Sequence, residues 1–129
     1  MKQIINTKNA PAAIGPYSQG VAVECGNGKM IFLSGQIALD PTTGSLAGSS
    51  IEEQTKQVMT NIAALLSETG AHFENIVKST IFLKNFDHFS TVNEIYGSYF
   101  PKDPPARSTV EVARLPKDAL LEIECIVVL

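Results

Sequence analysis

The hydrophobic positions of the chain recur with two different periods, and the clearest helical period lies near the middle. Segment Ile51–Thr69 has apolar residues at helical spacing, which gives one hydrophobic stripe along its length. Ser50 and Glu53 have the spacing of a capping box, in which each side chain bonds a free backbone amide of the first turn. Gly70 can adopt the left-handed conformation that ends a helix. The pattern therefore predicts a helix over 51–69.

A second helix is predicted over His88–Phe100. Its apolar residues follow the spacing of one helix face: Phe89, Val92, Tyr96 and Phe100. Asp87 precedes this stretch and is a residue type that caps helices. Pro101 follows it and cannot continue a helix.

Six other segments are typical of strands, because they are rich in apolar and β-branched residues and are bounded by Gly, Pro or Asn. They are Gln3–Asn6, Val21–Cys25, Met30–Gln36, Ile76–Lys84, Arg107–Ala113 and Leu120–Val128. In Ile76–Lys84, the alternation of side chains along a strand predicts that one face is formed by Val77, Ser79, Ile81 and Leu83. The order β-β-β-α-β-α-β-β predicts a single α+β domain over residues 1–129, with two helices on one face of a six-stranded mixed sheet.

The predicted sheet has more apolar surface than two helices on one face can cover. Met30–Leu33 and Cys125–Leu129 are apolar at both alternating positions, whereas a face exposed to water should be polar. The rest of the chain is too short to supply a second layer. The pattern therefore predicts self-association through the uncovered face.

Composition excludes several classes of protein. The chain has 129 residues, 44% hydrophobic and 18% charged, with a net charge of -3, two His and two Cys. This inventory argues against a zinc or multi-histidine metal site, a disulfide framework and a nucleic-acid-binding face. From the sequence we expect no signal peptide and no membrane-spanning stretch, and we expect a reduced, cytoplasmic protein.

Arg107 and Glu122 are the strongest candidates for substrate-binding and catalytic residues. Arg107 follows a proline-stiffened approach to a strand, and its forked guanidinium suits a carboxylate ligand; a solvated arginine at a strand end is the alternative. Glu122 and Glu124 point to the same face of an otherwise apolar strand. If a neighbouring subunit covers that face, one of them becomes a candidate general base; a solvated rim carboxylate is equally compatible with the spacing.

Weaker candidates lie in three other places. Tyr17 follows Gly15-Pro16 in a loop and is either a pocket-lining or a packing residue. Gly35 ends a strand, where a glycine allows close approach of a ligand or simply permits a turn. Asn93 lies beside the apolar stripe of the second helix and is either a site residue or half-exposed. No catalytic serine triad is present, and without a phosphate-binding loop the sequence gives no positive evidence for a phosphate or nucleotide cofactor.

Several motifs in the chain are similar to those of the RidA family, also called YjgF, the reactive-intermediate imine/enamine deaminases. They are Asn9–Gly20, Ser34-Gly35-Gln36, Pro105–Val112, Leu115–Asp118 and Ile123-Glu124. The resemblance covers essentially the whole chain. It implies a chorismate-mutase-like fold and a homotrimer with a pocket at each subunit interface.

The resemblance also implies a reaction and a set of site residues. The family hydrolyses 2-imino acids, the tautomers of 2-aminoacrylate and 2-aminocrotonate, to 2-oxo acids and ammonia without a cofactor. Its carboxylate-binding arginine falls on Arg107, its water-holding acid on Glu122 and its pocket tyrosine on Tyr17. Asn93 and the Ser34-Gly35 backbone match further pocket positions. Many members have Cys where this chain has Thr109, which excludes a thiol-based step here; backbone groups at Thr109 should still serve the substrate.

Two other functions remain open from the sequence. One is a non-enzymatic trimeric module that binds ligands or protects proteins, and the other is a ribonuclease. The acidic net charge and the absence of a catalytic histidine pair argue against the ribonuclease.

Overall fold

The computed structural model describes all 129 residues, and its centre is a six-stranded sheet in the order β1-β2-β3-β6-β4-β5. The strands are β1 (Lys2–Ile5), β2 (Gly20–Cys25), β3 (Gly28–Gln36), β4 (Ile76–Leu83), β5 (Ala106–Glu111) and β6 (Leu121–Val128). The long helices are α1 (Ile51–Thr69) and α2 (Phe89–Gly97). Short 3-10 turns lie at Phe73–Asn75, Phe86–His88 and Pro116–Asp118.

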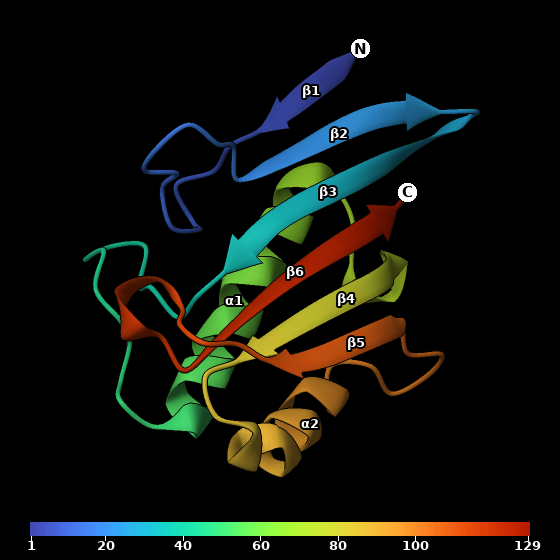
Figure 1. Ribbon diagram of the computed structural model, residues 1–129. Helices are drawn as coiled ribbons and strands as arrows, with labels where there is room; N and C mark the ends of the chain where they lie inside the picture. The colour runs from blue at the N-terminus through green and yellow to red at the C-terminus, as the bar shows by residue number, and fades with distance from the viewer.

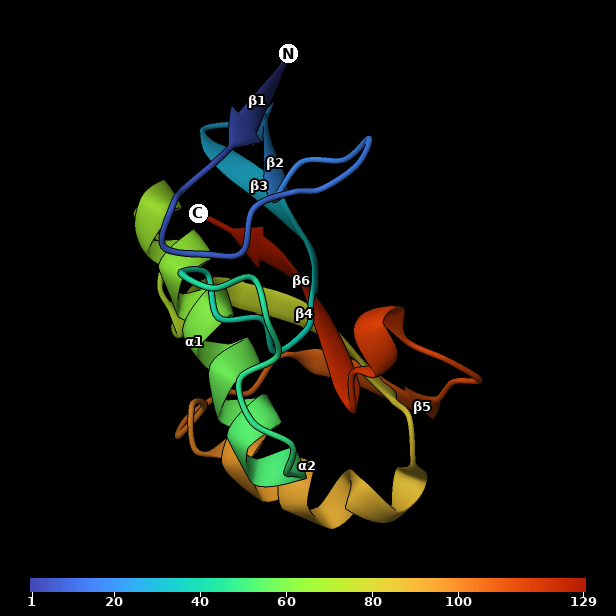
Figure 2. The same ribbon diagram turned by 90° about the vertical axis from the view of Figure 1, so that its left-hand side faces the viewer.

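Both helices lie on the same face of the sheet and leave the other face open (Figures 1 and 2). Neighbouring strands are antiparallel except for β4 and β5, which are parallel, so the sheet is mixed. The predicted element order and α+β fold class are confirmed. Neither helix combines the length and hydrophobicity needed to cross a bilayer.

Helix α1 begins and ends where the local signals predict. The Ser50 hydroxyl accepts a hydrogen bond from the Glu53 amide at 3.1 Å, and Glu53 Oε1 accepts one from the Ser50 amide at 3.3 Å. Gly70 ends the helix with a φ of 80°, in the left-handed region. The residues that face the sheet, including Val58, Ile62 and Leu65, are almost fully buried.

The expected cap of the second helix is wrong. Asp87 does not cap α2, whose N-cap position is His88 and has no capping side-chain hydrogen bond. The capping side chain in this region is Asn85, whose Oδ1 accepts a hydrogen bond from the Asp87 amide at 2.9 Å and caps the turn that precedes the helix. The chain then forms a 3-10 turn over Phe86–His88 before α2 starts at Phe89. The α-helix ends at Gly97, so it is shorter at both ends than the stretch 88–100 predicted from its hydrophobic spacing.

The predicted face of β4 also needs one correction. Ser79, Ile81 and Leu83 are buried under the helices as expected, but Val77 is 46% exposed and Ile76 is buried in its place. A β-bulge between Ile76 and Lys78 in the pairing with β6 shifts the alternation by one residue at that point.

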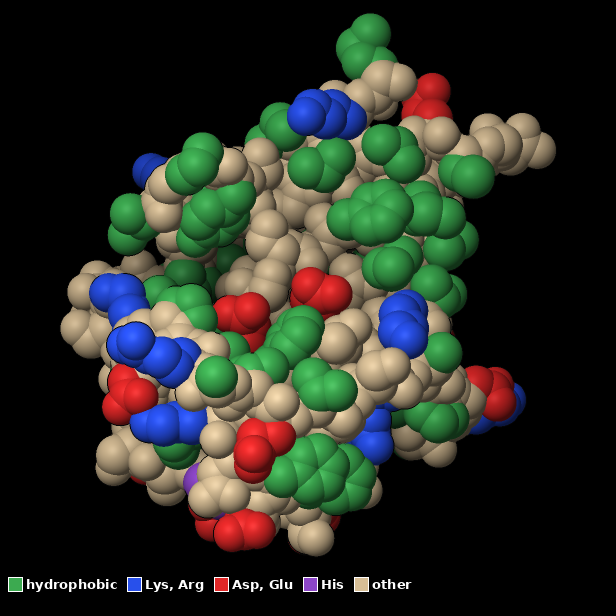
Figure 3. Space-filling view, in the orientation of Figure 1, with side chains coloured by type: hydrophobic (Ala, Val, Ile, Leu, Met, Phe, Trp, Pro, Cys, Tyr) green, Lys and Arg blue, Asp and Glu red, His purple; other side chains and the backbone are tan.

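The open face of the sheet carries exposed hydrophobic side chains. Ile4, Phe32, Val110 and Val128 are each more than 40% exposed. Figure 3 shows hydrophobic side chains gathered over the strands on this face. Ile31 and Leu33 on β3, and Cys125 and Val127 on β6, are buried on the opposite side. These parts of β3 and β6 are therefore apolar on both faces, as predicted, while the self-association inferred from this pattern stays a prediction.

Candidate active site

A pocket of about 680 Å³ lies on the open face beside the ends of β3 and β6. It brings together three of the predicted site residues: Tyr17, Gly35 and Glu122. We call it the glutamate pocket, because Glu124 also lines it, two residues along β6 from Glu122. Its walls include Ile14, Ile37 and Leu39, so the two carboxylates lie in a partly apolar hollow.

Glu122 has the electrostatic environment of a group that can exchange protons. Burial raises the pKa of its carboxyl, and the negative charge of Glu124 raises it further. Both effects act in the same direction, because each disfavours the ionised form. A carboxyl whose pKa is raised toward neutrality is better matched to general acid–base work.

Gly35 gives Glu122 the space that it occupies. A Cβ atom built on Gly35 would lie 2.7 Å from Glu122 Oε1 and 2.8 Å from its Cδ. The pairing of β3 with β6 has a bulge between Leu33 and Gln36, and Gly35 lies inside it. The bulge and the missing side chain together let the carboxyl of Glu122 lie against the backbone of β3.

Tyr17 reaches the glutamate pocket from the loop between β1 and β2. The loop is organised by Gln19, which is 2% exposed and bonds backbone groups across it. Gln19 Nε2 donates to the carbonyls of Thr7 at 2.9 Å and Pro11 at 2.8 Å, and its Oε1 accepts from the Thr7 amide at 2.7 Å. Tyr17 itself is 54% exposed, so its ring is available to a ligand or a neighbouring molecule.

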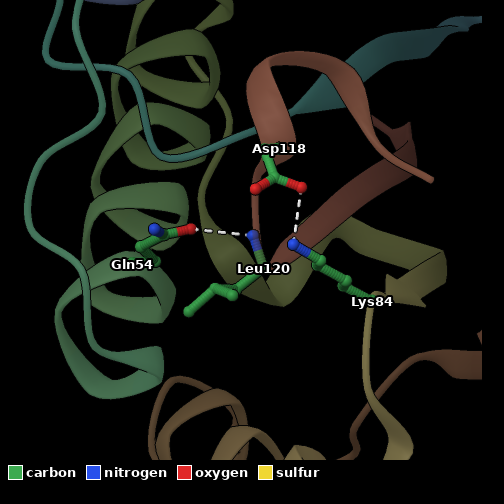
Figure 4. Close-up of polar contacts among 4 residues, drawn as sticks. All are labelled: Gln54, Lys84, Asp118 and Leu120. Carbon is green, nitrogen blue, oxygen red and sulfur yellow. Dashed lines mark hydrogen bonds and ion pairs between the residues drawn. The ribbon is translucent and has the colours of Figure 1, made fainter.

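The turn that carries Lys117 to the glutamate pocket is anchored on both sides (Figure 4). Asp118 pairs with Lys84 at 2.5 Å, and the amide of Leu120 donates to Gln54 Oε1 at 2.9 Å. Lys117 and Asp118 have backbone φ values of 55° and 57°, which residues other than glycine rarely adopt. These contacts hold the turn in a conformation that its own backbone disfavours.

A second hollow, of about 410 Å³, holds the other predicted residues. Arg107 and Asn93 line it together with Tyr96 and Pro105, and we call it the arginine pocket. Arg107 Nη1 donates to Asn93 Oδ1 at 2.8 Å. The guanidinium lies over the rings of Phe89 and Tyr96, with its Cζ 5.7 Å and 5.3 Å from their centroids.

Thr109 lies two residues after Arg107 on β5 and lines neither of these pockets. Its side-chain oxygen is buried and has no hydrogen-bond partner within the chain. A buried hydroxyl without a partner is costly, and such groups in native proteins usually have a reason. The resemblance to the RidA family implies a role for backbone groups at this position, whereas the structure shows an unpaired hydroxyl as well.

The two pockets lie on opposite faces of the sheet. Arg107 is paired in register with Ser79, whose side chain is buried under the helices. Glu122 is paired with Phe82, which has the opposite parity on β4 and faces the open side. One chain therefore brings Tyr17, Gly35 and Glu122 together, and separately brings Arg107 and Asn93 together, without joining the two groups.

Gln19 and Lys117 belong to the glutamate pocket and escape the sequence reasoning. Both lie in motifs that resemble the RidA family, Gln19 in Asn9–Gly20 and Lys117 in Leu115–Asp118, but the motifs alone assign them no role. The place of Lys117 at the pocket depends on the anchored turn. No group of three His, Cys, Asp or Glu side chains is placed to hold a metal ion.

Comparison with known proteins identifies the family. Residues 7–129 match the family described as Endoribonuclease L-PSP. The chain is 48% identical to Reactive Intermediate Deaminase A of Arabidopsis thaliana, across 99% of this chain and 66% of that protein. It is 45% identical to 2-iminobutanoate/2-iminopropanoate deaminase of Bos taurus, across 99% of this chain and 90% of that protein.

Comparison of the fold with solved structures supports the same family. A crystal structure of a Rid-family protein from Yersinia pestis, described as being of unknown function, superposes with a TM-score of 0.93. It is 52% identical in sequence, and the match covers 100% of both chains. The chain therefore belongs to the Rid family, also called RidA or YjgF, which the resemblance of its motifs predicts. Some relatives in this family bear deaminase names, and others have names that state no reaction, such as RutC family protein.

Proposed function

We propose that the protein hydrolyses reactive 2-imino acids to 2-oxo acids and ammonia without a cofactor. The substrates would be 2-iminobutanoate and 2-iminopropanoate, the tautomers of 2-aminocrotonate and 2-aminoacrylate. Glu122 is the observation that carries the proposal: a half-buried carboxyl with a raised pKa, held in a hollow beside Tyr17. The names of the Arabidopsis and bovine relatives support the same reaction.

Arg107 would bind the substrate carboxylate. Its guanidinium has five N–H donors, and only the one that Nη1 donates to Asn93 is engaged within the chain. The remaining donors can form two parallel bonds to a carboxylate, which fix both the position and the orientation of the imine carbon. The hydroxyl of Thr109, unpaired and two residues away on the same strand, is a further donor for the substrate.

Glu122 would hold and activate the attacking water. As the water oxygen bonds to the imine carbon, Glu122 takes one proton from the water and passes it to the imine nitrogen, which gives a carbinolamine and restores the carboxylate. The hydroxyl then becomes the carbonyl, the C–N bond breaks, and the proton leaves with the nitrogen as ammonia. One imine and one water give one 2-oxo acid and one ammonia, so nothing else is consumed.

The reaction needs Arg107 and Glu122 at the same substrate, which one chain cannot supply because they lie on opposite faces of its sheet. We infer that the complete site forms between copies of the chain, in a homotrimer. The apolar open face, with Phe32, Val110 and Val128 exposed, supports such an assembly. Arg107 on the edge strand β5 of one copy would then enter the glutamate pocket of the next.

Ribonuclease activity is the rival function, because the matched family bears an endoribonuclease description. The charges oppose it. The glutamate pocket has Glu122 and Glu124 against the single cation Lys117, and the net charge of the chain is -3. Such a site repels the phosphates on which RNA binding mainly depends.

A coupled assay tests the proposal. A pyridoxal-phosphate-dependent dehydratase acting on threonine releases the enamine, and oxo-acid formation is followed with and without the protein. We expect the wild type to accelerate it and Arg107→Ala to abolish the acceleration while the oligomer stays intact. Wild-type turnover by Arg107→Ala would contradict the proposal, as would cleavage of an RNA oligonucleotide without any effect on the imine.

A further inference from the structure

One face of α2 forms a cradle for Arg107. Phe89, Asn93 and Tyr96 are spaced i, i+4 and i+7, so they lie along the same side of the helix. All three contact the same guanidinium, two through their rings and one through its amide oxygen. The sequence presents Phe89 and Tyr96 as ordinary core positions, whereas in the structure they flank a charged group.

The contacts restrict the guanidinium in two ways. The rings of Phe89 and Tyr96 attract its positive charge and limit the space in which it can move. Asn93 accepts a hydrogen bond from Nη1 and so favours one orientation of the group. Because Asn93 takes only one donor, the rest of the fork stays free for a carboxylate.

Tyr96 is the member of the cradle that is itself held. Its side chain is 4% exposed, and its hydroxyl donates to Ser79 Oγ at 2.9 Å. Ser79 is fully buried, and its Oγ also lies 3.6 Å from Cys125 Sγ on β6. A chain of contacts therefore runs from the centre of the sheet through Ser79 and the Tyr96 ring to Arg107. A phenylalanine would fill nearly the same space without this hydrogen bond.

We propose that Tyr96 is a positioning residue that holds Arg107 in the orientation that receives the substrate carboxylate. Asn93 shares this role, so it acts through Arg107 rather than by touching the substrate. The inference rests on the proposed function, since it concerns the residue that would bind the imino acid.

Tyr96→Leu tests the inference with two readouts. Loss of the ring contact should lower kcat/KM for 2-iminobutanoate by about two- to thirtyfold, mainly through KM. The second readout is the side-chain Nε–H signal of Arg107 in a nitrogen-15 NMR spectrum. The only other arginine is Arg114, which is exposed and serves as an internal reference. The rings should shift the wild-type Arg107 signal away from that of Arg114, and Tyr96→Leu should move it back toward it.

Two further variants complete the design. Tyr96→Phe keeps the ring and the volume but loses the bond to Ser79, so it covers the case in which Tyr96→Leu does not fold. We expect a fall in kcat/KM of about two- to tenfold. Phe73→Leu is the control: the Phe73 ring packs against those of Tyr99 and Phe100 and is not one of the rings under Arg107. It should lower the melting temperature and leave kcat/KM and the Arg107 signal unchanged.

The outcomes separate this inference from the proposed function. A wild type that hydrolyses no imine overturns the function. An active wild type, an inactive Arg107→Ala and Tyr96 variants with normal kcat/KM overturn only the positioning role. A lower kcat/KM with an unshifted Arg107 signal also overturns it, since Tyr96 would then act through the fold in general. The inference is supported when the Arg107 signal and kcat/KM change together in the Tyr96 variants and neither changes in Phe73→Leu.

Discussion

Gly35 and Glu122 occupy adjoining space on neighbouring strands, such that a Cβ atom on Gly35 would lie 2.7 Å from Glu122 Oε1. Carbon and oxygen atoms that are not bonded do not approach so closely, so any side chain at position 35 must displace the carboxyl. The glycine therefore leaves room for the candidate base, in addition to any approach of substrate to its backbone. This relation makes a substitution on β3 a test of chemistry assigned to β6.

Gly35→Ala should impair hydrolysis more than stability. The atoms that clash belong to the flexible end of Glu122, which can swing aside at small cost to the fold, but no longer holds water at the same place. We expect kcat to fall at least about tenfold, as for other displaced catalytic groups, with a change in melting temperature of a few degrees. Kinetics and thermal denaturation measure the two effects. In a Glu122→Ala background the thermal effect should disappear, and its persistence would contradict the steric explanation.

The pH dependence of hydrolysis should report the environment of Glu122. The ionised carboxylate is the form that accepts a proton from water, so kcat/KM falls as the pH drops through the pKa of Glu122. Because that pKa is raised, the fall should be centred above 4.5, the ordinary value. Glu124→Gln removes the neighbouring charge that raises the pKa, so the acid limb should move to lower pH. An acid limb that stays in place or moves to higher pH in Glu124→Gln would contradict the assignment of that limb to Glu122.

Thr109→Val should affect stability and activity in opposite directions. Valine keeps the shape of the side chain and removes a buried hydroxyl that has no partner in the chain. The free energy of unfolding should stay unchanged or rise by about 1 kcal/mol, whereas kcat/KM should fall about two- to tenfold if the hydroxyl bonds the substrate. Thr109→Ser, which keeps the hydroxyl, is the matched control for activity. Equal kinetics of the valine and serine variants would exclude a role for the hydroxyl.

Gln19→Leu should loosen the loop that carries Tyr17. It removes bonds from a buried amide to Thr7 and Pro11, and leaves their backbone groups unpaired. We expect a loss of about 1–3 kcal/mol in the free energy of unfolding, faster hydrogen exchange over residues 7–17, and a higher KM. Gln3→Leu, at an exposed glutamine, should change stability by no more than about 0.5 kcal/mol. Unchanged exchange in the Gln19 variant would show that the loop is held by other contacts.

Features that depend on neighbouring residues are predictable from the sequence. The limits of α1 follow from Ser50, Glu53 and Gly70, because a capping box and a left-handed glycine act within one turn of chain. The two faces of β6 are equally predictable, since alternation in a strand is strictly local. Glu122 is therefore assigned correctly to the face opposite the helices.

Features that depend on pairing between distant segments are not predictable in this way. Val77 is assigned to the wrong face because the bulge arises where β4 meets β6. Asp87 does not cap α2 because it lies inside a 3-10 turn that Asn85 caps, and the spacing of the apolar residues does not reveal that turn. The role of Gly35 depends on the bulge opposite Glu122, and the cradle around Arg107 depends on the side of α2 that faces β5. Hydrophobic spacing alone predicts that Tyr96 is a core residue and does not predict its contact with the charged guanidinium of Arg107.

A subunit-mixing experiment tests most directly that Arg107 and Glu122 act on one substrate from different copies of the chain. Arg107→Ala and Glu122→Gln should each be inactive alone. When equal amounts are unfolded together and refolded, random assembly pairs an intact Arg107 with an intact Glu122 in about one quarter of the sites. We predict that about a quarter of the wild-type activity returns. Mixed oligomers that form, as shown by mass spectrometry, and yet remain inactive would contradict the shared site.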